Sequence, residues 1–168
     1  WYKASYDGTY SEITIGSNNA YYDNMISGNG MFIATGYLSN STGDPVWYTA
    51  VSTDGNTWTE HAFSTDGYER FIITGICFYG GKFFIYGPAI LDQSTQNYKY
   101  PLLFSTDGIT WNQEGFINKE EAIGNGVYGC FVHEGNYFYS QGGTQNLYYS
   151  QDGLNWTNAI SNNNSWTR

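Results

Sequence analysis

The heptapeptide Ser52-Thr53-Asp54-Gly55-Asn56-Thr57-Trp58 decides the fold, because it recurs along the chain. Two further copies read Ser105-Thr106-Asp107-Gly108-Ile109-Thr110-Trp111 and Ser150-Gln151-Asp152-Gly153-Leu154-Asn155-Trp156. A weaker copy near the start, Ser5-Tyr6-Asp7-Gly8-Thr9-Tyr10, has tyrosine where the others have tryptophan. Neighbouring copies lie roughly 45 to 53 residues apart, and a fixed period of this size indicates an array of small structural repeats.

Each copy contains Asp followed by Gly, which predicts a tight hairpin turn. Glycine accepts a positive φ, and the aspartate carboxylate can accept hydrogen bonds from nearby backbone N–H groups. Serine adds a second local bond, and tryptophan supplies bulk that can pack between neighbouring units. We therefore predict structural roles for twelve residues of the three strong copies: Ser52, Asp54, Gly55, Trp58, Ser105, Asp107, Gly108, Trp111, Ser150, Asp152, Gly153 and Trp156.

A second motif, rich in glycine and aromatic residues, lies midway through each repeat. It occupies residues 30–36, 81–87 and 135–142, and a short apolar run precedes it each time. Each repeat then contains four short strands, and four strands in roughly 45–50 residues is the size of one β-propeller blade. The predicted fold is all-β, a β-propeller or partial β-propeller forming one repeat domain over residues 1–168. Its predicted parts are a half blade at 1–15, blades at about 20–63, 71–117 and 123–160, and a tail at 161–168.

Composition supports this fold class and excludes several kinds of partner. Aromatic residues make up 20% of the chain and charged residues only 12%, which argues against disorder and against a helical bundle. The net charge is −9 with six basic residues, too few for a phosphate-binding patch, so we expect no nucleic-acid partner. No apolar run is long enough to predict membrane insertion.

The repeats resemble the Asp-box, or bacterial neuraminidase repeat, of sialidase-like β-propellers. The usual form is S-x-D-x-G-x-T-W, and the shorter S-x-D-G-x-T-W form found here resembles repeats of phage tail and extracellular bacterial proteins. The resemblance covers nearly the whole chain and implies the fold, but such propellers serve as hydrolases, receptors and assembly factors. Sialidase chemistry resembles a cluster of three arginines with a Tyr–Glu pair and an aspartic acid. Because Arg70 and Arg168 are the only arginines, we do not expect that chemistry from this chain.

Binding is expected on the loops at the end of the blades opposite the Asp-Gly turns. These connections differ from repeat to repeat, and variable loops on a rigid scaffold commonly carry binding. They are predicted at residues 16–23, 37–46, 64–70, 88–99, 118–126 and 143–146. Tyrosine and amide side chains suit both sugars and proteins. The candidate ligand-binding residues are Tyr21, Tyr22, Asp44, Tyr68, Arg70, Asp92, Gln93 and Gln145.

The first functional hypothesis is a non-enzymatic module that recognises a cell-surface glycan or protein, on a phage tail or other virion appendage, or on a bacterial surface protein. One alternative is a glycan hydrolase that uses two carboxylates, with candidates Asp23, Asp44, Asp66, Glu69, Asp92, Glu120 and Glu121. A second alternative is a purely structural propeller in a larger assembly. No metal site or cofactor is expected, since Cys77 and Cys130 belong to no Cys/His cluster. The chain begins with Trp1, so we expect a piece of a longer product, with other copies or other segments completing the ring.

Overall fold

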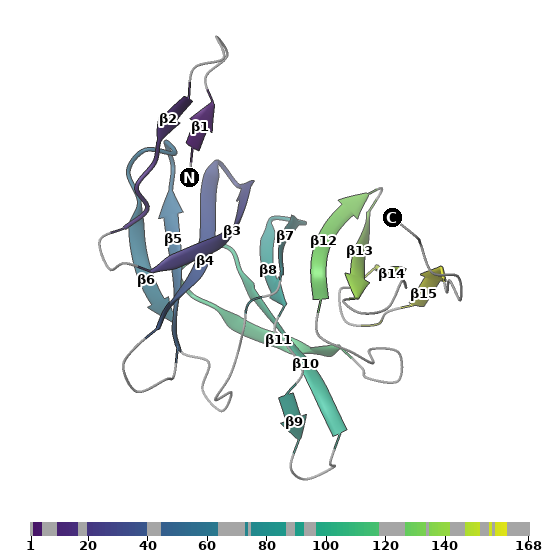
Figure 1. The fold of residues 1–168 in the computed structure, drawn as a ribbon. Helices are drawn as coiled ribbons and strands as arrows, with labels where there is room; N and C mark the ends of the chain where they lie inside the picture. Colours follow the sequence, from purple (N-terminus) through teal and green to yellow (C-terminus); the bar gives the residue numbers. More distant parts are fainter. Residues whose placement is uncertain are drawn as a thin grey trace, which may run out of the picture.

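The computed structural model describes about two thirds of the chain. The described residues are 2–4, 10–16, 20–39, 45–63, 73, 75–86, 90–92, 97–117, 127–133, 135–141, 147–151, 155 and 157–160. Every regular element among them is a β-strand, which confirms the all-β prediction (Figure 1). Within the part of the chain that the structure describes, no helix is long and apolar enough to cross a membrane.

Three antiparallel four-stranded sheets follow one another along the chain. The first sheet consists of β3 (Tyr21–Gly28), β4 (Met31–Ser39), β5 (Pro45–Ser52) and β6 (Thr59–Phe63) in that order. The second consists of β7 (Gly75–Tyr79), β8 (Lys82–Tyr86), β10 (Asn97–Ser105) and β11 (Asn112–Ile117). The third consists of β12 (Val127–His133), β13 (Asn136–Gln141), β14 (Leu147–Ser150) and β15 (Thr157–Ile160). In every sheet, strands that follow one another along the main path pair with one another, as in an up-and-down blade.

Two smaller pairings accompany the three sheets. β1 (Tyr2–Ala4) pairs with β2 (Tyr10–Glu12) as a separate two-stranded sheet. β9 (Ile90–Asp92) pairs with the start of β10, beyond the point at which β10 joins β8. This second hairpin gives the second sheet an extension that the other two sheets do not show among the described residues.

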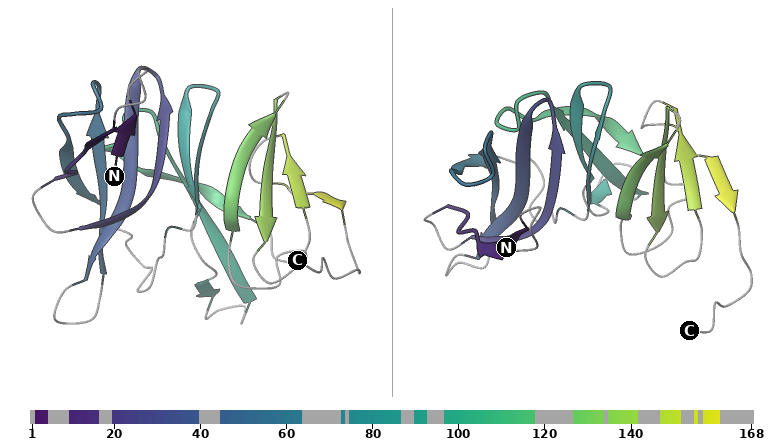
Figure 2. Two further views of the ribbon diagram at one scale, coloured as in Figure 1. Left: turned by 45° about the horizontal axis from the view of Figure 1, so that its top comes forward. Right: turned by 90° about the horizontal axis from the view of Figure 1, so that it is seen from above.

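The sheets lie side by side in chain order (Figure 2). The first strand of each sheet contacts the first strand of the next, β3 against β7 and β7 against β12. The innermost strands of adjacent propeller blades meet in this way.

Among the described residues, a hydrophobic core lies between the first and second sheets. Ile33 and Trp47 of the first sheet pack with Phe83, Ile85 and Leu103 of the second, and all five side chains are buried. Removing this much apolar surface from water is the main stabilising term in such a fold. The core therefore depends on the pairing of two successive repeats rather than on one repeat alone.

Strand boundaries correct three of the predicted loops. β4 and β5 pair through Ser39 and Pro45, so half of the predicted 37–46 connection is strand. β9 and the start of β10 occupy much of the predicted 88–99 connection, and β3 already begins at Tyr21 within the predicted 16–23 connection. The predicted connections at 64–70, 118–126 and 143–146 lie outside the described residues.

Candidate functional site

A row of three aromatic rings runs from the core to the surface at the loop end of the first sheet. Tyr21, Tyr37 and Trp47 pair across β3, β4 and β5, so their side chains lie on one face. The ring centroids of Tyr21 and Tyr37 are 5.8 Å apart, and those of Tyr37 and Trp47 are 5.5 Å apart. Trp47 is 5% exposed and Tyr21 is 66% exposed. We call these three residues the aromatic row. The exposed ring of Tyr21 packs on Tyr37, which in turn packs on the buried Trp47.

The two neighbouring candidate tyrosines, Tyr21 and Tyr22, lie on opposite faces of β3, because successive strand residues alternate between faces. A β-bulge follows them: the register of β3 shifts between Tyr22 and Asn24, so Asp23 is the extra residue. The hydroxyl of Tyr22 donates a 2.6 Å hydrogen bond to Glu60 Oε1. Burial and this bond to Glu60 raise the pKa of the Tyr22 hydroxyl well above its usual value of 10. Tyr22 therefore stays protonated and acts as a hydrogen-bond donor.

Asp23 stands in the bulge beside the aromatic row. Desolvation by burial raises the pKa of its carboxyl above the usual value, although the Asn24 amide donates a 3.3 Å hydrogen bond that acts in the opposite direction. A carboxyl with a raised pKa can hold a proton at higher pH than an ordinary aspartate. Among the described residues, it is the carboxyl nearest in sequence to the outer ring of the row.

The Asp-Gly turns lie at the other end of the sheet, beside the β3–β4 and β7–β8 hairpins. Asp54 Oδ1 accepts hydrogen bonds from the backbone N–H groups of Asn56 at 2.7 Å and Thr57 at 2.8 Å. The hydroxyl of Ser52 accepts a 2.8 Å bond from the N–H of Gly55 and donates to Asp54. The bonds from Thr57 and Asn56 lower the pKa of Asp54 to about 2. This carboxylate is engaged inside its own turn.

The second turn repeats this geometry and also joins two sheets. Asp107 Oδ1 accepts bonds of 2.8 Å from the N–H groups of Ile109 and Thr110. Partial desolvation works to raise the pKa of Asp107, but the backbone bonds and Ser105 outweigh it and leave the pKa below its usual value. The carbonyl of Gly108 accepts a buried 2.6 Å bond from the Thr49 hydroxyl of the first sheet.

A groove of about 510 Å³ lies beside the first of these turns. We call it the Trp58 groove; its lining residues are Thr14, Gly16, Asn56, Thr57, Trp58, Thr59 and Glu60. Gly16 lies so close to Glu60 that a Cβ on Gly16 would overlap the Glu60 carboxyl group. Within the described part of the chain, the buried indole N–H of Trp58 has no hydrogen-bond partner, whereas the equivalent N–H of Trp111 donates to Gly108 O at 3.3 Å.

The predicted site residues are only partly within the described structure. Asp92 ends β9, but its side chain is not among those described. The remaining predicted ligand residues lie outside the described residues: Asp44, Tyr68, Arg70, Gln93 and Gln145. So do Asp152, Gly153 and Trp156 of the third turn, while Ser150 is buried at the end of β14. The predicted ligand-binding roles therefore stay predictions.

Sequence reasoning missed three residues that the structure joins to the candidate site. Tyr37 and Trp47 complete the aromatic row, and Glu60 holds Tyr22. An aromatic residue at matching positions of paired strands would have indicated the row, once the strands were extended past Gly36. Glu60 had no such signal, because its hydrogen bond with Tyr22 joins residues 38 positions apart in the sequence. Among the described residues, no group of three or more His, Cys, Asp and Glu side chains could hold a metal ion.

No family model matches the chain, and no curated protein matches its sequence. Among solved structures, it is similar to an α-L-arabinanase of Penicillium chrysogenum complexed with arabinobiose, with a TM-score of 0.64 and 15% identity over 94% of this chain and 53% of that one. It is similar to fructan 1-exohydrolase IIa from Cichorium intybus, with a TM-score of 0.57 and 13% identity over 83% of this chain and 31% of that one.

A third similar structure is YCF48 bound to D1 peptide, with a TM-score of 0.54 and 17% identity over 87% of this chain and 41% of that one. The chain thus spans between 31% and 53% of the length of these proteins. Identities this low concern the fold alone. The chain is all-β, is built of antiparallel four-stranded sheets, and is similar in fold to part of a β-propeller.

Proposed function

We propose that the chain is a non-enzymatic recognition module that binds a glycan at the loop end of its first sheet. The aromatic row carries this proposal, because Tyr21 is 66% exposed while Trp47, two strands away, is buried in the core. An exposed aromatic ring that is supported from below loses little conformational freedom when a ligand stacks on it. The row is therefore a preorganised platform.

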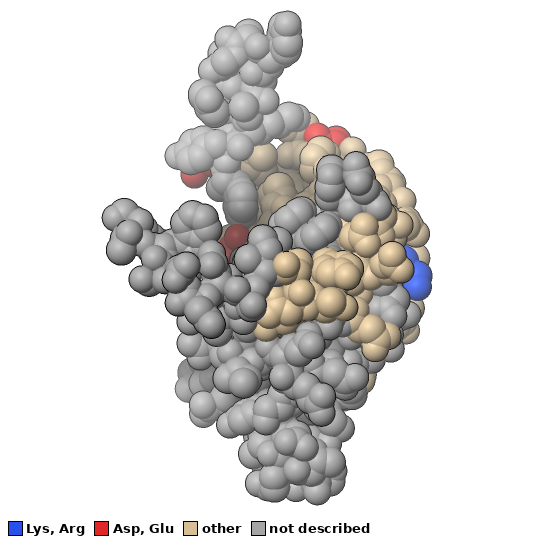
Figure 3. Space-filling view, turned by 90° about the vertical axis from the view of Figure 1, so that its right-hand side faces the viewer, with Lys and Arg blue, Asp and Glu red and all other residues tan. Residues whose placement is uncertain are grey.

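The chemistry of the platform suits a neutral sugar better than a charged ligand. Aromatic rings pack against the apolar C–H faces of sugar rings, and amide and hydroxyl groups bond to sugar hydroxyls. The net charge of −9 repels anions. Figure 3 views the molecule from the side of the third sheet, where few of the described residues are charged. We include in the proposal that a virion appendage or a bacterial surface protein presents this module to a cell-surface glycan.

A second candidate function is a glycan hydrolase that uses two carboxylates. Most of the similar solved structures are glycoside hydrolases, and a raised pKa at Asp23 is the property that a general acid needs. Hydrolysis requires a second carboxylate about 5–10 Å from the first. In this hypothesis Asp44 or Asp92 would supply it, and hydrolysis would be lost in Asp23→Asn while glycan binding persisted.

A glycan array probed with the 168-residue protein tests the proposal, and calorimetry then measures affinity for the best glycan. We expect Tyr21→Ala to weaken binding by about tenfold or more, because the outer ring is lost. Ile109→Ala is the matched control, since Ile109 is an exposed apolar residue on the opposite end of the second sheet.

An array and a bacterial-cell binding assay that both stay blank would overturn the recognition proposal. Equal binding by Tyr21→Ala and the parent protein would remove the aromatic row from it. Release of reducing sugar from a bound glycan, abolished in Asp23→Asn, would establish the hydrolase in its place.

A further inference from the structure

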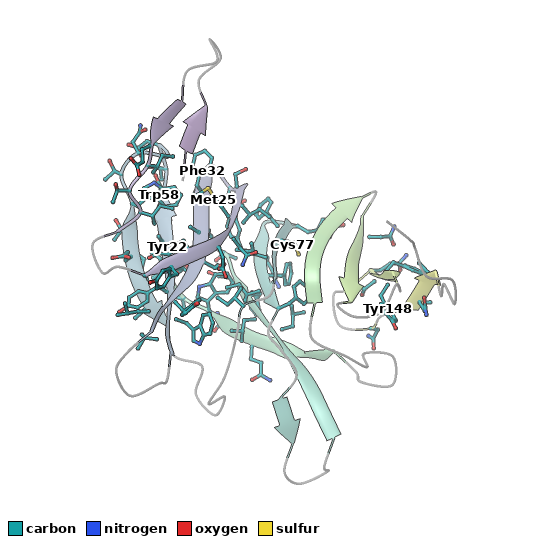
Figure 4. All side chains as sticks on the ribbon, viewed as in Figure 1. Tyr22, Met25, Phe32, Trp58, Cys77 and Tyr148 are labelled. Carbon is teal, nitrogen blue, oxygen red and sulfur yellow. The ribbon has the colours of Figure 1, made fainter. Side chains whose placement is uncertain are left out.

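The hairpin turns that close β3–β4 and β7–β8 meet between the first and second sheets. Asn29 Nδ2 donates a 2.8 Å hydrogen bond to the carbonyl oxygen of Gly81, 52 residues further along the sequence. The first strands of the two sheets, which carry Met25 and Cys77 in Figure 4, run into these turns and contact each other. We call the bond from Asn29 to Gly81 the turn bridge.

Both turns have the same two-residue form, so their positions can be compared directly. Asn29 and Gly30 have φ values of 49° and 72°. Gly80 and Gly81 have φ values of 57° and 78°. A positive φ at both central residues is the type I′ geometry that two-residue hairpins favour. Among the described residues, Asn29 is the one non-glycine residue with a positive φ. Glycine adopts this conformation without steric cost, as Gly80 does, and the turn bridge is what Asn29 adds.

An asparagine that is followed by glycine can lose its side-chain amide without an enzyme. The backbone nitrogen of Gly30 attacks Cγ of Asn29, and the new N–Cγ bond closes a five-membered succinimide ring. The Cγ–Nδ2 bond breaks, and Nδ2 leaves as ammonia with the proton from the Gly30 N–H. Water then opens the ring at either carbonyl and gives aspartate or isoaspartate. One water is consumed and one ammonia is released, and no oxidant or reductant is needed.

The surroundings of Asn29 and Gly30 leave this reaction unobstructed. Both residues are exposed, so water and hydroxide reach the turn. Apart from its chain neighbours, a Cβ on Gly30 would meet no heavy atom within 4 Å. The hydrogen bond that closes a turn of this kind is donated by the residue after the two central ones, here Met31, so it does not use the Gly30 N–H.

The Asp-Gly turns contain a related dipeptide, but their hydrogen bonds protect it. The N–H groups of Gly55 and Gly108 each donate a 2.8 Å bond to a serine hydroxyl, which holds the nitrogen that would attack. Asp54 and Asp107 have lowered pKa values and are therefore carboxylates, which are much weaker electrophiles than an amide. The turn of Asn29 differs from both in these two respects.

We propose that Asn29 is a site of spontaneous deamidation, with water as the co-reactant, and that the reaction removes the turn bridge permanently. The attack requires Asn29 Cγ to turn away from Gly81 toward the Gly30 nitrogen, so it proceeds while the bridge is open. The aspartate that forms has no N–H to donate and would place a carboxylate against the Gly81 carbonyl oxygen, so the bridge does not form again. The inference is independent of glycan binding, because Asn29 and the aromatic row lie at opposite ends of β3 and β4.

Peptide mapping by mass spectrometry, after incubation of the 168-residue protein in mildly alkaline buffer, tests the modification. Trypsin cleaves after Lys3 and Arg70, so Asn29 and the exposed Asn56 are followed in one fragment. We expect the acid form to accumulate at Asn29, faster at higher pH, while Asn56 keeps its amide because a bulkier residue follows it. The other Asn-Gly pair, at 125–126, lies in a different fragment and is measured separately. An Asn29 that keeps its amide as long as Asn56 does would overturn the proposal.

Three variants separate the loss of the turn bridge from the added charge. Asn29→Asp is the reaction product, and its thermal midpoint should fall by about 2–4 °C, the shift expected from losing one hydrogen bond in a chain of this size. Asn29→Gly reproduces the second turn and cannot deamidate. Its midpoint should fall less, because glycine adopts the turn without strain and adds no charge. Asn112→Asp adds the same charge at an exposed residue outside both turns and should leave the midpoint almost unchanged.

The incubated parent protein supplies the last comparison. Ion-exchange chromatography separates the chains that have gained a negative charge, and those modified at Asn29 should unfold at the midpoint of Asn29→Asp. A modified fraction or an Asn29→Asp variant as stable as the parent protein would overturn the loss of the bridge. A fall in Asn112→Asp as large as that in Asn29→Asp would overturn it as well, because charge alone would then explain the effect.

Discussion

Replacing Gly108 with alanine tests whether the second Asp-Gly turn locks two sheets together. The variant has two costs. Gly108 has a φ of +73°, and an alanine in that conformation costs about 1–2 kcal/mol. Its Cβ would also overlap Ile33 Cδ1 and come within 2.9 Å of Ile33 Cγ1, in a core where Ile33 is fully buried. Such overpacking costs about a further 1–3 kcal/mol.

Gly55→Ala is the matched control for this change. Gly55 holds the same position in the first turn with a φ of +72°, but the nearest atom to its Cβ is 3.6 Å away on Phe32. It should lose only the conformational part, about 1–2 kcal/mol. The difference between the free energies of unfolding of the two variants then measures how closely Gly108 packs against Ile33 and Val51.

Urea unfolding followed by tryptophan fluorescence gives both free energies of unfolding. Adding Ile33→Val removes the Cδ1 atom that Gly108→Ala meets. Ile33→Val alone should cost about 0.5–1.5 kcal/mol, and it should cost less, or stabilise, in the Gly108→Ala background. Equal losses of unfolding free energy in Gly108→Ala and Gly55→Ala would refute the idea that the packing of Gly108 against Ile33 holds the two sheets together. Strictly additive effects of Gly108→Ala and Ile33→Val would refute it as well.

Three further predictions concern two turn carboxylates and the partly buried Tyr22. The fold holds the pKa of Asp54 at about 2, below its usual 3.8, so the stabilising effect of its carboxylate is present above pH 4 and is lost as the pH falls through 2. The thermal unfolding midpoint should drop over this pH window, and it should drop less steeply in Asp54→Asn. In the same assay Asp107→Ala should lower the midpoint while leaving the affinity of the folded protein for its glycan unchanged, and lost binding at full stability would contradict the structural role. Tyr22→Phe removes the bond to Glu60 and should lower the free energy of unfolding by about 1–2 kcal/mol, measured by urea unfolding; no loss would mean that Glu60 finds another donor.

Much of the fold could be predicted because the repeat fixes its own turns. A glycine that needs a positive φ and an aspartate that caps its own turn mark the hairpins locally, so the strands between them followed. Gly36 misled the prediction, because it was taken as the end of a strand. It lies inside β4 instead, where a Cβ would overlap the carbonyl oxygen of Tyr21. This glycine is required by a close approach between strands rather than by a turn.

The candidate site could be predicted less well, because it depends on register. Tyr21 and Tyr22 were both predicted as ligand-binding residues, yet the alternation of side chains along β3 places them on opposite faces. The bulge at Asp23 leaves no local mark in the sequence, since its cause is the pairing of β3 with β4. The approach of Gly16 to Glu60 depends on tertiary packing in the same way.

Comparing the three repeats separates residues that serve the fold from those available for recognition. The position of Phe32 is aromatic in all three sheets, as Phe83 in the second and Tyr137 in the third, and the turn tryptophan also recurs. Residues that recur are those that packing between neighbouring sheets requires. The position of Trp47 is Tyr100 in the second repeat and Gln145 in the third, and within the described part of the chain the complete aromatic row is seen in the first sheet. Repeat packing does not require that row, and recognition is the role that its exposed outer ring can serve.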